Sequence, residues 1–437
     1  MKRIYEAEAY KPDSGSYWAS TVDPEAWPNL DQDHSCDIAI IGGGFSGLNA
    51  ALTLARSGRK VAVFDAMHPG WGASGRNGGF CCAGGALISP ARMDKYFGDG
   101  AGADWLQAET QAIDHVSGLL ADHAIDADTH SQGETCLAHS KRAWRAMQKQ
   151  AAETPPNAEA PPQLLTRQDL QAQGLNGPWL GGLTSPKGFA LNPMKYLSGL
   201  AQAVNSAGAE LFQNAPVSQI TPSASGWQLT IGPHQVQAKQ VILATNGYSS
   251  DDLPDWLGAR YLPVQSHVIV TRPLTDAEQQ EAGWWSDQMA YDSRNLLHYF
   301  RLMPDGRFLF GMRGGLRATD KSQQALSRKI RQDFNQMFPA WREVEISHEW
   351  SGLVCLMGDL CPFVGQVPEA PNLYAALGFH GNGVAMGSYA GHLLAQHLTD
   401  GTALPATMAA PPGKFPLGRF RRTLLAPSYW LAETFDL

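Results

Sequence analysis

A glycine turn, Gly42-Gly-Gly-Phe-Ser-Gly47, interrupts the chain between a strand pattern and a helix pattern. Residues 36–41 form an apolar run typical of a buried strand, and residues 48–56 have helical spacing that ends at Gly58. Residues 60–65 form a second apolar run. Strand, helix and strand in this order predict a βαβ unit with parallel strands and a right-handed crossover.

The turn has the spacing G-x-G-x-x-G, which in this context predicts a dinucleotide site. Gly42 permits the tight turn, Gly44 lets a pyrophosphate approach the backbone, and Gly47 lets helix and strand pack closely. The helix N-terminus offers N–H groups and a positive dipole end to the phosphates. Asp65, 18 residues beyond the last glycine, is placed to meet the adenosine ribose. The residues expected at this end of the ligand are Gly42, Gly44, Phe45, Ser46, Gly47, Asp65 and Ala66.

A second glycine-rich segment, residues 69–79, follows the ribose-binding strand and carries an arginine and an asparagine. A dinucleotide with a bulky tricyclic ring needs backbone to approach it from more than one loop. The segment therefore favours FAD over NAD, with a glycine-rich surface turn as the alternative. Its expected cofactor contacts are Gly72, Ala73, Ser74, Arg76, Asn77, Gly78 and Gly79.

Strand and helix patterns recur near the start, middle and end of the chain, and residues 260–312 alternate as an antiparallel sheet would. Residues 210–220 are expected to form one strand. The predicted fold class is α/β, and α+β overall, with a Rossmann-like FAD-binding domain interleaved with a substrate domain built on a mainly antiparallel sheet. The expected division is an N-terminal arm (1–35), an FAD-binding domain (36–95, 190–255 and 350–405), a substrate domain (96–189 and 256–349) and a C-terminal tail (406–437).

The formal charge of −8, from 33 basic and 41 acidic residues, argues against a nucleic-acid partner. We expect a cytoplasmic protein, because residues 1–10 lack the apolar core of a secretion signal and no apolar run approaches the length of a transmembrane segment. The six cysteines show no metal-ligand spacing, so we expect reduced thiols and no metal. The oligomeric state is left open.

Four motifs occur in a family-specific order: the glycine turn after residue 41, Gly72–Gly79, Val241-Ile-Leu-Ala-Thr-Asn-Gly247 and Gly378-Phe-His-Gly-Asn-Gly-Val384. Together they resemble the D-amino-acid-oxidase-type family of FAD oxidoreductases. The resemblance runs from about residue 17 to past 400, and within the family the chain looks most like bacterial gamma-glutamylputrescine oxidases.

The resemblance implies further cofactor contacts. Val217, at the end of a strand, would pair with the adenine through its backbone, and Ala244, Thr245 and Asn246 would border the cofactor. The last motif would lie beside the flavin pyrimidine edge, with the helix from Val384 pointing its positive dipole end at the ring. The contacts expected there are Gly378, His380, Gly381, Asn382, Gly383 and Val384. His380 and Asn382 depart from the family's commoner residues, and a turn histidine is an equal reading of His380.

Three departures bear on the chemistry. Sarcosine oxidases of this family attach FAD to a cysteine at the position of Gly352, so we expect non-covalent FAD here, with Cys355 nearby. Ala385 stands where those enzymes hold the substrate carboxylate with a lysine, which favours an amine substrate. Leu309 stands where a lysine assists oxygen, so the electron acceptor is O2 or another acceptor.

Residues 295–301 and 305–313 predict a hairpin that turns at Asp305-Gly306. Alternation puts His298 and Phe300 on one face and Tyr299 and Arg301 on the other, so one pair at most lines a pocket. Arg301 or Arg313 would bind a remote carboxylate, or lie on an ordinary strand surface. Trp350 would wall the site or pack in the core. The catalytic candidates are His298, Tyr299, Arg301, Arg313, Trp350 and His380.

The expected reaction oxidises a C–N bond in a small amine or amino acid, with a gamma-glutamylputrescine-like amine favoured. A hydride passes from the carbon bearing the neutral amine to flavin N5, and the imine is hydrolysed. One alternative is an FAD-dependent dehydrogenase of a 2-hydroxy acid or of an N-methyl or cyclic amino acid such as sarcosine or pipecolate. Another is a binding or tRNA-modifying subunit with structural FAD, which the acidic balance disfavours.

Overall fold

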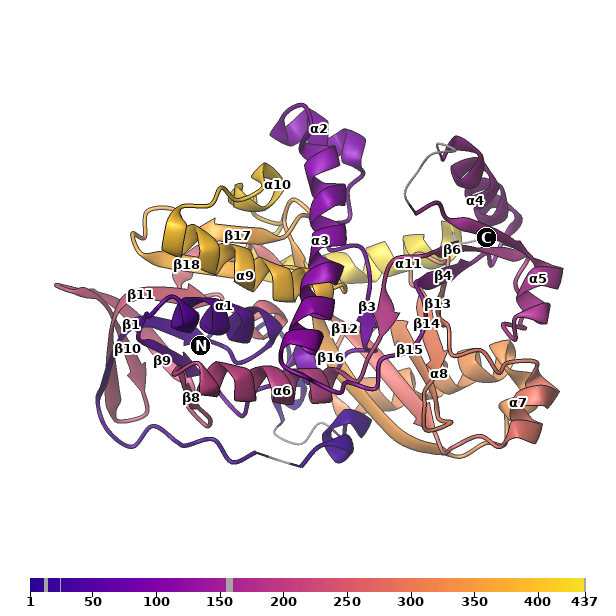
Figure 1. The fold of residues 1–437 in the computed structure, drawn as a ribbon, viewed down its shortest axis with the longest axis horizontal. Helices are drawn as coiled ribbons and strands as arrows, with labels where there is room; N and C mark the ends of the chain where they lie inside the picture. The colour runs from indigo at the N-terminus through magenta and orange to yellow at the C-terminus, as the bar shows by residue number, and fades with distance from the viewer. Residues whose placement is uncertain (12–14, 24, 155–159, 436–437) are drawn as a thin grey trace.

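The computed structural model describes residues 1–11, 15–23, 25–154 and 160–435. Within them, two eight-stranded sheets carry the fold, and a two-stranded sheet of β3 (Phe80–Cys81) and β7 (Phe189–Ala190) adds to them. In Figure 1 the first sheet lies on the left with α1, α6 and α9, and the second on the right with α4, α5, α7 and α8. The fold is therefore the expected mixture of a Rossmann-like part and a mainly antiparallel part.

The first sheet has the order β17-β18-β11-β1-β2-β8, with β10 and β9 continuing from β11. β1 pairs in parallel with both β2 and β11, as the βαβ prediction requires. Its last four residues are buried, which is typical of a central parallel strand. The strands are β1 (His34–Ile41), β2 (Val61–Phe64), β8 (Glu210–Phe212), β9 (Val217–Ser223), β10 (Gly226–Ile231), β11 (His234–Leu243), β17 (Phe363–Gln366) and β18 (Leu373–Leu377).

Helices cover one face of this sheet. α1 is rich in alanine and leucine and is buried over most of its length, so tertiary packing supports its helical preference. It packs with α6 and α9 in one apolar cluster, which α3 also joins through Trp105 and Ile113. These helices are α1 (Phe45–Arg56), α3 (Ala101–Asp122), α6 (Pro193–Ser206) and α9 (Ala385–Asp400), and α2 (Pro90–Phe97) and α10 (Ala406–Ala409) flank them.

The second sheet has the order β16-β12-β15-β14-β13-β4-β6-β5. Neighbouring strands are antiparallel except β13 and β4, which pair in parallel. Its strands are β4 (Glu134–Leu137), β5 (Gln163–Thr166), β6 (Gly181–Ser185), β12 (Tyr261–Thr271), β13 (Met289–Asp292), β14 (His298–Leu302), β15 (Phe308–Arg313) and β16 (Ile346–Met357). The remaining helices are α4 (Lys141–Glu153), α5 (Arg167–Ala172), α7 (Asp276–Ala282), α8 (Asp320–Met337) and α11 (Leu425–Phe435).

The two faces of the second sheet differ in chemistry. Phe300, Phe308 and Phe310 lie on one face and pack with α8 through Phe334. The β14–β15 pairing confirms the expected hairpin and puts Tyr299 and Arg301 on the opposite face. That opposite face carries the cavity described below.

Three sequence expectations differ from the structure. Residues 210–220 form two strands, because Asn214 adopts a positive φ of 49° and residues 214–215 donate hydrogen bonds to the loop after β2. Val217 therefore begins β9 and does not end a strand. α3, expected in the substrate domain, packs with the helices of the first sheet, and β16 begins before residue 350 as part of the second sheet. With these changes, the interleaved division remains our proposal for the domains.

Candidate functional site

The glycine turn forms a tight bend between β1 and α1. Gly42 has a φ of +108°, and a Cβ there would lie 2.7 Å from the Ala244 carbonyl oxygen, so no other residue fits without strain. A Cβ on Gly47 would collide with the Gly42 carbonyl, which agrees with the close helix–strand packing expected of it. The N-cap Gly44 provides no side-chain cap for α1. Apart from the Phe45 N–H, which donates to Ser74 Oγ, first-turn N–H groups are thereby left for a ligand, as in anion sites at helix N-termini.

Asp65 lies directly after β2 and holds two backbone segments together. Its Oδ2 accepts the Gly43 N–H at 2.8 Å, and its Oδ1 accepts the Met67 N–H at 2.9 Å. Burial raises the pKa of this carboxyl, and the two N–H bonds oppose that shift. Asp65 therefore shapes the glycine turn as well as lining the cavity beside it.

The second glycine segment is tied to the first by Ser74, whose Oγ accepts the Phe45 N–H. Asn77 shapes the segment from within: its Nδ2 donates to Ser74 O at 2.8 Å, and its Oδ1 accepts the Gly79 N–H at 2.7 Å. Arg76 Nε donates to Trp71 O at 2.7 Å. Its Nη2 is buried without a hydrogen-bond partner among the described residues. Buried donors are normally hydrogen-bonded, so Arg76 can donate to a ligand acceptor.

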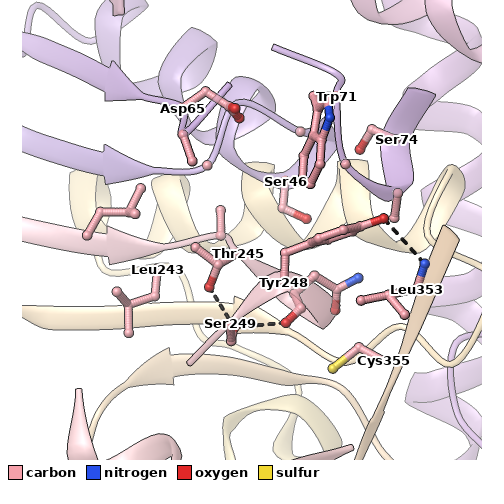
Figure 2. A pocket seen from close by; sticks show the side chains of 18 of the residues that line it. Ser46, Asp65, Trp71, Ser74, Leu243, Thr245, Tyr248, Ser249, Leu353 and Cys355 are labelled. Carbon is pink, nitrogen blue, oxygen red and sulfur yellow. Dashed lines mark hydrogen bonds between the residues drawn. The ribbon is translucent and has the colours of Figure 1, made fainter. Parts of the chain in front are cut away.

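A first cavity of about 1390 Å³, including space open to solvent, runs along these two glycine segments. Figure 2 shows Ser46, Asp65, Trp71 and Ser74 on one side of it and Tyr248 reaching across to Leu353. The Leu353 N–H donates to the Tyr248 hydroxyl at 3.3 Å. At the far end the cavity is lined by Met1, Arg3, Ala215, Pro216, Val217 and Leu253. Its length and the open helix N-terminus fit an extended, anionic dinucleotide.

A second cavity adjoins the first and shares Ala73, Asn77, Leu353, Val354, Gly381 and Val384 with it. Its floor is one face of the second sheet, as the strand register shows. Six adjacent strands contribute to this floor, through Gly352 (β16), Ser266 (β12), Arg313 (β15), Tyr299 (β14), Tyr291 (β13) and Glu134 (β4). We call this set the six-strand floor.

Two catalytic candidates, Tyr299 and Arg313, lie on the six-strand floor. The Tyr299 hydroxyl shares a hydrogen bond of 2.9 Å with Ser266 Oγ. Burial raises the pKa of Tyr299, so the phenol is neutral at physiological pH. Arg313 Nη2 donates to His380 O at 3.4 Å, and no carboxylate is among the main groups that shift the pKa of this guanidinium. Arg313 is thus a partly buried cation that faces the cavity without a carboxylate partner among the described residues.

His380 itself does not line either cavity. Its Nδ1 donates to Gly85 O at 2.7 Å, and its Nε2 accepts the Met357 N–H at 3.1 Å. Burial lowers the pKa of His380 to about 4, so the imidazole is neutral and both ring nitrogens are occupied. The structure places it as a turn histidine, with a φ of +49°.

The other three catalytic candidates lie away from the cavity. His298 is on the opposite face of the sheet, where it bonds to Asp292 at 2.8 Å and to Asp333 of α8 at 3.1 Å. Arg301 is fully buried, and its guanidinium donates to the carbonyls of Gly78 and Leu191. Trp350 packs against Trp18 and donates to Arg76 O, so it has the core role given as its alternative.

The predicted cofactor residues come together around the two cavities, with the exceptions of Gly47, Gly79, Gly378 and His380. Sequence reasoning missed Ser266, Tyr291, Glu134, Phe80 and Cys82, which line the second cavity. Alternation in residues 260–312 could have marked Ser266 and Tyr291 as facing one side. Nothing local marks Glu134, because it joins the site only through the parallel pairing of β4 with β13.

All six cysteines lie in the described part of the chain and are free thiols. Among the described residues, no group of three or more His, Cys, Asp or Glu side chains could hold a metal ion. Over the same residues, no helix combines the length and apolar character needed to span a bilayer.

Comparison with known proteins agrees with this site. The family model described as "DAO: FAD dependent oxidoreductase" matches residues 37–397. The chain is 29% identical to "Probable oxidoreductase OrdL" of Haemophilus influenzae, covering 89% of each chain. It is 27% identical to the "Gamma-glutamylputrescine oxidoreductase" of Escherichia coli, covering 95% of this chain and 97% of that protein. The solved glycine oxidase of Geobacillus kaustophilus has a similar fold, with a TM-score of 0.67 at 20% identity over 85% of this chain and 96% of that one.

Proposed function

Because the chain belongs to the DAO family of FAD-dependent oxidoreductases, we propose that it oxidises a C–N bond in a small substrate that carries an amine, with a gamma-glutamylputrescine-like amine favoured. The family match supports the cofactor, and the similarity to a protein named gamma-glutamylputrescine oxidoreductase supports the substrate class. The rest of the proposal comes from the site.

The observation that carries the proposal is the junction of the two cavities. Ala73, Asn77, Leu353, Val354, Gly381 and Val384 border both. A dinucleotide whose phosphates lie at α1 would therefore place its ring where the second cavity begins. α9 starts at this junction, with Val384 as its N-cap and no side-chain cap. The positive end of its dipole therefore lies where the two cavities meet.

The chain's own residues bind and orient the substrate. Arg313, which lacks a counterion, would hold a remote carboxylate such as a gamma-glutamyl group presents. Tyr299, fixed by Ser266, offers a neutral hydrogen-bonding group beside it. Phe80 and Leu297 line the same cavity and exclude water from part of it.

FAD, when bound, would supply the two-electron acceptor. Once the substrate ammonium has lost its proton, the carbon next to the neutral nitrogen would give up a hydride, and water would hydrolyse the imine to a carbonyl compound and ammonia or an amine. O2 or another acceptor would take the electrons. Positioning accounts for most of what the chain must supply, since a neutral amine needs no further acid–base help.

The test is anaerobic reduction of the flavin absorbance band in the purified protein. The panel contains gamma-glutamylputrescine, putrescine, glycine, sarcosine, proline and 2-hydroxyglutarate. Bleaching by an amine with release of a carbonyl product supports the proposal. Bleaching by 2-hydroxyglutarate alone overturns it.

The cofactor assignment has its own test, Gly44→Val with Gly118→Val as the control. A Cβ on Gly44 would lie 2.8 Å from Ser74 Oγ, whereas a Cβ on Gly118, exposed on α3, meets nothing within 4 Å. We expect Gly44→Val to be purified without flavin and Gly118→Val to keep it. Equal flavin content in the two variants would refute the assignment of this glycine turn to the phosphates.

A further inference from the structure

Glu134 is a carboxyl group deep in the molecule that faces the second cavity. Burial raises its pKa to about 7, a hydrogen bond with the Cys82 thiol opposes that shift, and the Glu109 carboxyl adds to it. No cation among the described residues acts on it. Ionising a carboxyl group in this position costs desolvation free energy unless a cation binds to it.

Arg313, on the same six-strand floor, is a cation without a carboxylate partner among the described residues. The side chains that raise its pKa most are Tyr299, Cys82, Tyr291 and Tyr429, none of which is a carboxylate. Arginine stays protonated in proteins, so this end of the cavity is positive. The cavity thus has one uncompensated cation and one uncompensated carboxyl group.

The two groups do not neutralise each other. Arg313 is on β15 and Glu134 on β4, three strands apart in the sheet. At about 4.8 Å per strand, their backbones are roughly 14 Å apart across the sheet. The register also offsets them by four residues, or about 13 Å, along the strands. Tyr299 and Tyr291 stand on the strands between them, on the same face. Neither charge is among those that shift the other's pKa.

We infer that Glu134 binds a cationic nitrogen of the substrate while Arg313 binds its carboxylate, so that the substrate class is an extended amino acid with its two charges far apart. An α-amino acid, whose charges are joined through a single carbon, cannot reach both groups. A simple diamine leaves Arg313 unpaired. This inference rests on the proposed function, because it names the substrate class of the same site.

Residues 82–83 position the Glu134 carboxyl through the hydrogen bond with the Cys82 thiol. Asn382 Nδ2 donates to Ala83 O at 2.8 Å and to Cys82 Sγ at 3.3 Å, which ties the segment to the loop before α9. The other titratable groups that face Glu134 are Tyr291, Cys136 and Glu109. The pKa values of Cys82, Cys136 and Tyr291 are all raised from their ordinary positions, mainly by burial, so these groups stay neutral between pH 6 and 8.

The experiment measures ligand binding to the flavin-loaded protein by the change in the flavin spectrum, without turnover. The probes are 6-aminohexanoate and hexanoate, which differ only in the cationic nitrogen. We expect 6-aminohexanoate to bind about tenfold or more tightly than hexanoate at pH 8, as a charged hydrogen bond in a buried site provides. The preference should shrink toward pH 6, because the Glu134 carboxyl becomes protonated there.

Glu134→Gln keeps the shape and removes the charge, so it should abolish the preference and its pH dependence while leaving hexanoate binding unchanged. Glu109→Gln is the matched control: its carboxyl is also buried and accepts from Trp105 Nε1 at 2.8 Å, but it does not line the cavity. It should keep the preference. If Glu134→Gln does not load flavin, Glu134→Asp should show a reduced preference.

Equal binding of the two probes to the unaltered protein, no binding of either, or a preference that survives in Glu134→Gln would each overturn the inference. The outcomes are separate from those of the proposed function. Amine oxidation without the preference rejects the inference alone, and the preference without amine oxidation rejects the proposed chemistry alone.

Discussion

Ser74 Oγ accepts the backbone N–H of Phe45 at 3.0 Å, and this bond joins two glycine segments that lie 29 residues apart in the chain. Phe45 is the first residue of α1, where the phosphates of a dinucleotide would lie. Ser74 is in the segment that continues into the second cavity through Arg76 and Asn77. One hydroxyl therefore sets the position of the cofactor's phosphate end relative to its ring end.

Replacing this hydroxyl should weaken cofactor binding. In Ser74→Ala the Phe45 N–H loses its acceptor, and we expect the Kd for FAD to rise about three- to tenfold. Titration of apoprotein with FAD, followed by quenching of flavin fluorescence, measures it. Ser57→Ala is the control, because Ser57 is exposed at the other end of α1 and donates to Leu54 O. Equal Kd values for the two variants would contradict the role given to Ser74.

The two arginines near the site, Arg301 and Arg313, should respond differently to replacement by lysine. Arg301→Lys cannot reach the carbonyls of Gly78 and Leu191 together, so the free energy of unfolding should fall by about 3 kcal/mol or more. Arg313→Lys should leave stability almost unchanged but raise KM about tenfold for a substrate that carries a carboxylate. Urea unfolding and steady-state kinetics on both variants check the pair. A KM effect of Arg301→Lys without loss of stability would reverse the assignment.

Stability should depend on pH through His298. Burial lowers the pKa of His298, but the hydrogen bonds to Asp292 and Asp333 outweigh burial and raise it overall. A raised folded pKa gives stability that is complete below the unfolded pKa, about 6.5, and is lost as the pH rises through the folded value. The free energy of unfolding should therefore fall above about pH 6.5 more steeply than in His298→Gln.

Urea unfolding between pH 6 and 9, followed by tryptophan fluorescence, tests this dependence. His234→Gln, at the start of β11 and partly exposed, is the control and should behave like the unaltered protein. A constant difference in unfolding free energy between the protein and His298→Gln over this range would rule out the proposed linkage.

The flavin should be released completely by acid or detergent. Gly352 has no side chain to form a bond, and burial raises the pKa of the Cys355 thiol to about 12, so little thiolate exists at neutral pH. A denaturing gel viewed under ultraviolet light should show no fluorescent protein band. A band that persists and disappears in Cys355→Ser would mean that this thiol carries the flavin.

The cofactor site could be predicted from sequence because most of its residues lie close together in the chain. The glycine turn, Asp65 and the segment from Gly72 to Gly79 lie within 38 residues, and their spacing alone implies the strand, the turn and the helix. The structure differs in detail, since α1 begins at Phe45 within the turn. The order of the βαβ unit and the antiparallel second sheet are both confirmed.

The substrate cavity could not be predicted in the same way. Alternation correctly separated His298 from Tyr299, but it does not say which face α8 covers, and α8 takes the His298 face through Asp333. Glu134 becomes a neighbour of Tyr291 only because β4 inserts beside β13, more than 150 residues later in the chain. Long-range strand order of this kind leaves no periodic trace near residue 134.

Side chains of the six-strand floor can be changed without changing the strand pairing of the sheet. Five of the six strands supply a side chain and β16 supplies Gly352, while the backbone hydrogen-bond ladder beneath does not depend on which side chains these are. Substituting Ser266, Tyr291 or Glu134 alters the cavity without touching the glycine segments that grip the phosphates. A combinatorial library at these three positions would therefore explore new specificities while the residues that bind the cofactor stay unchanged.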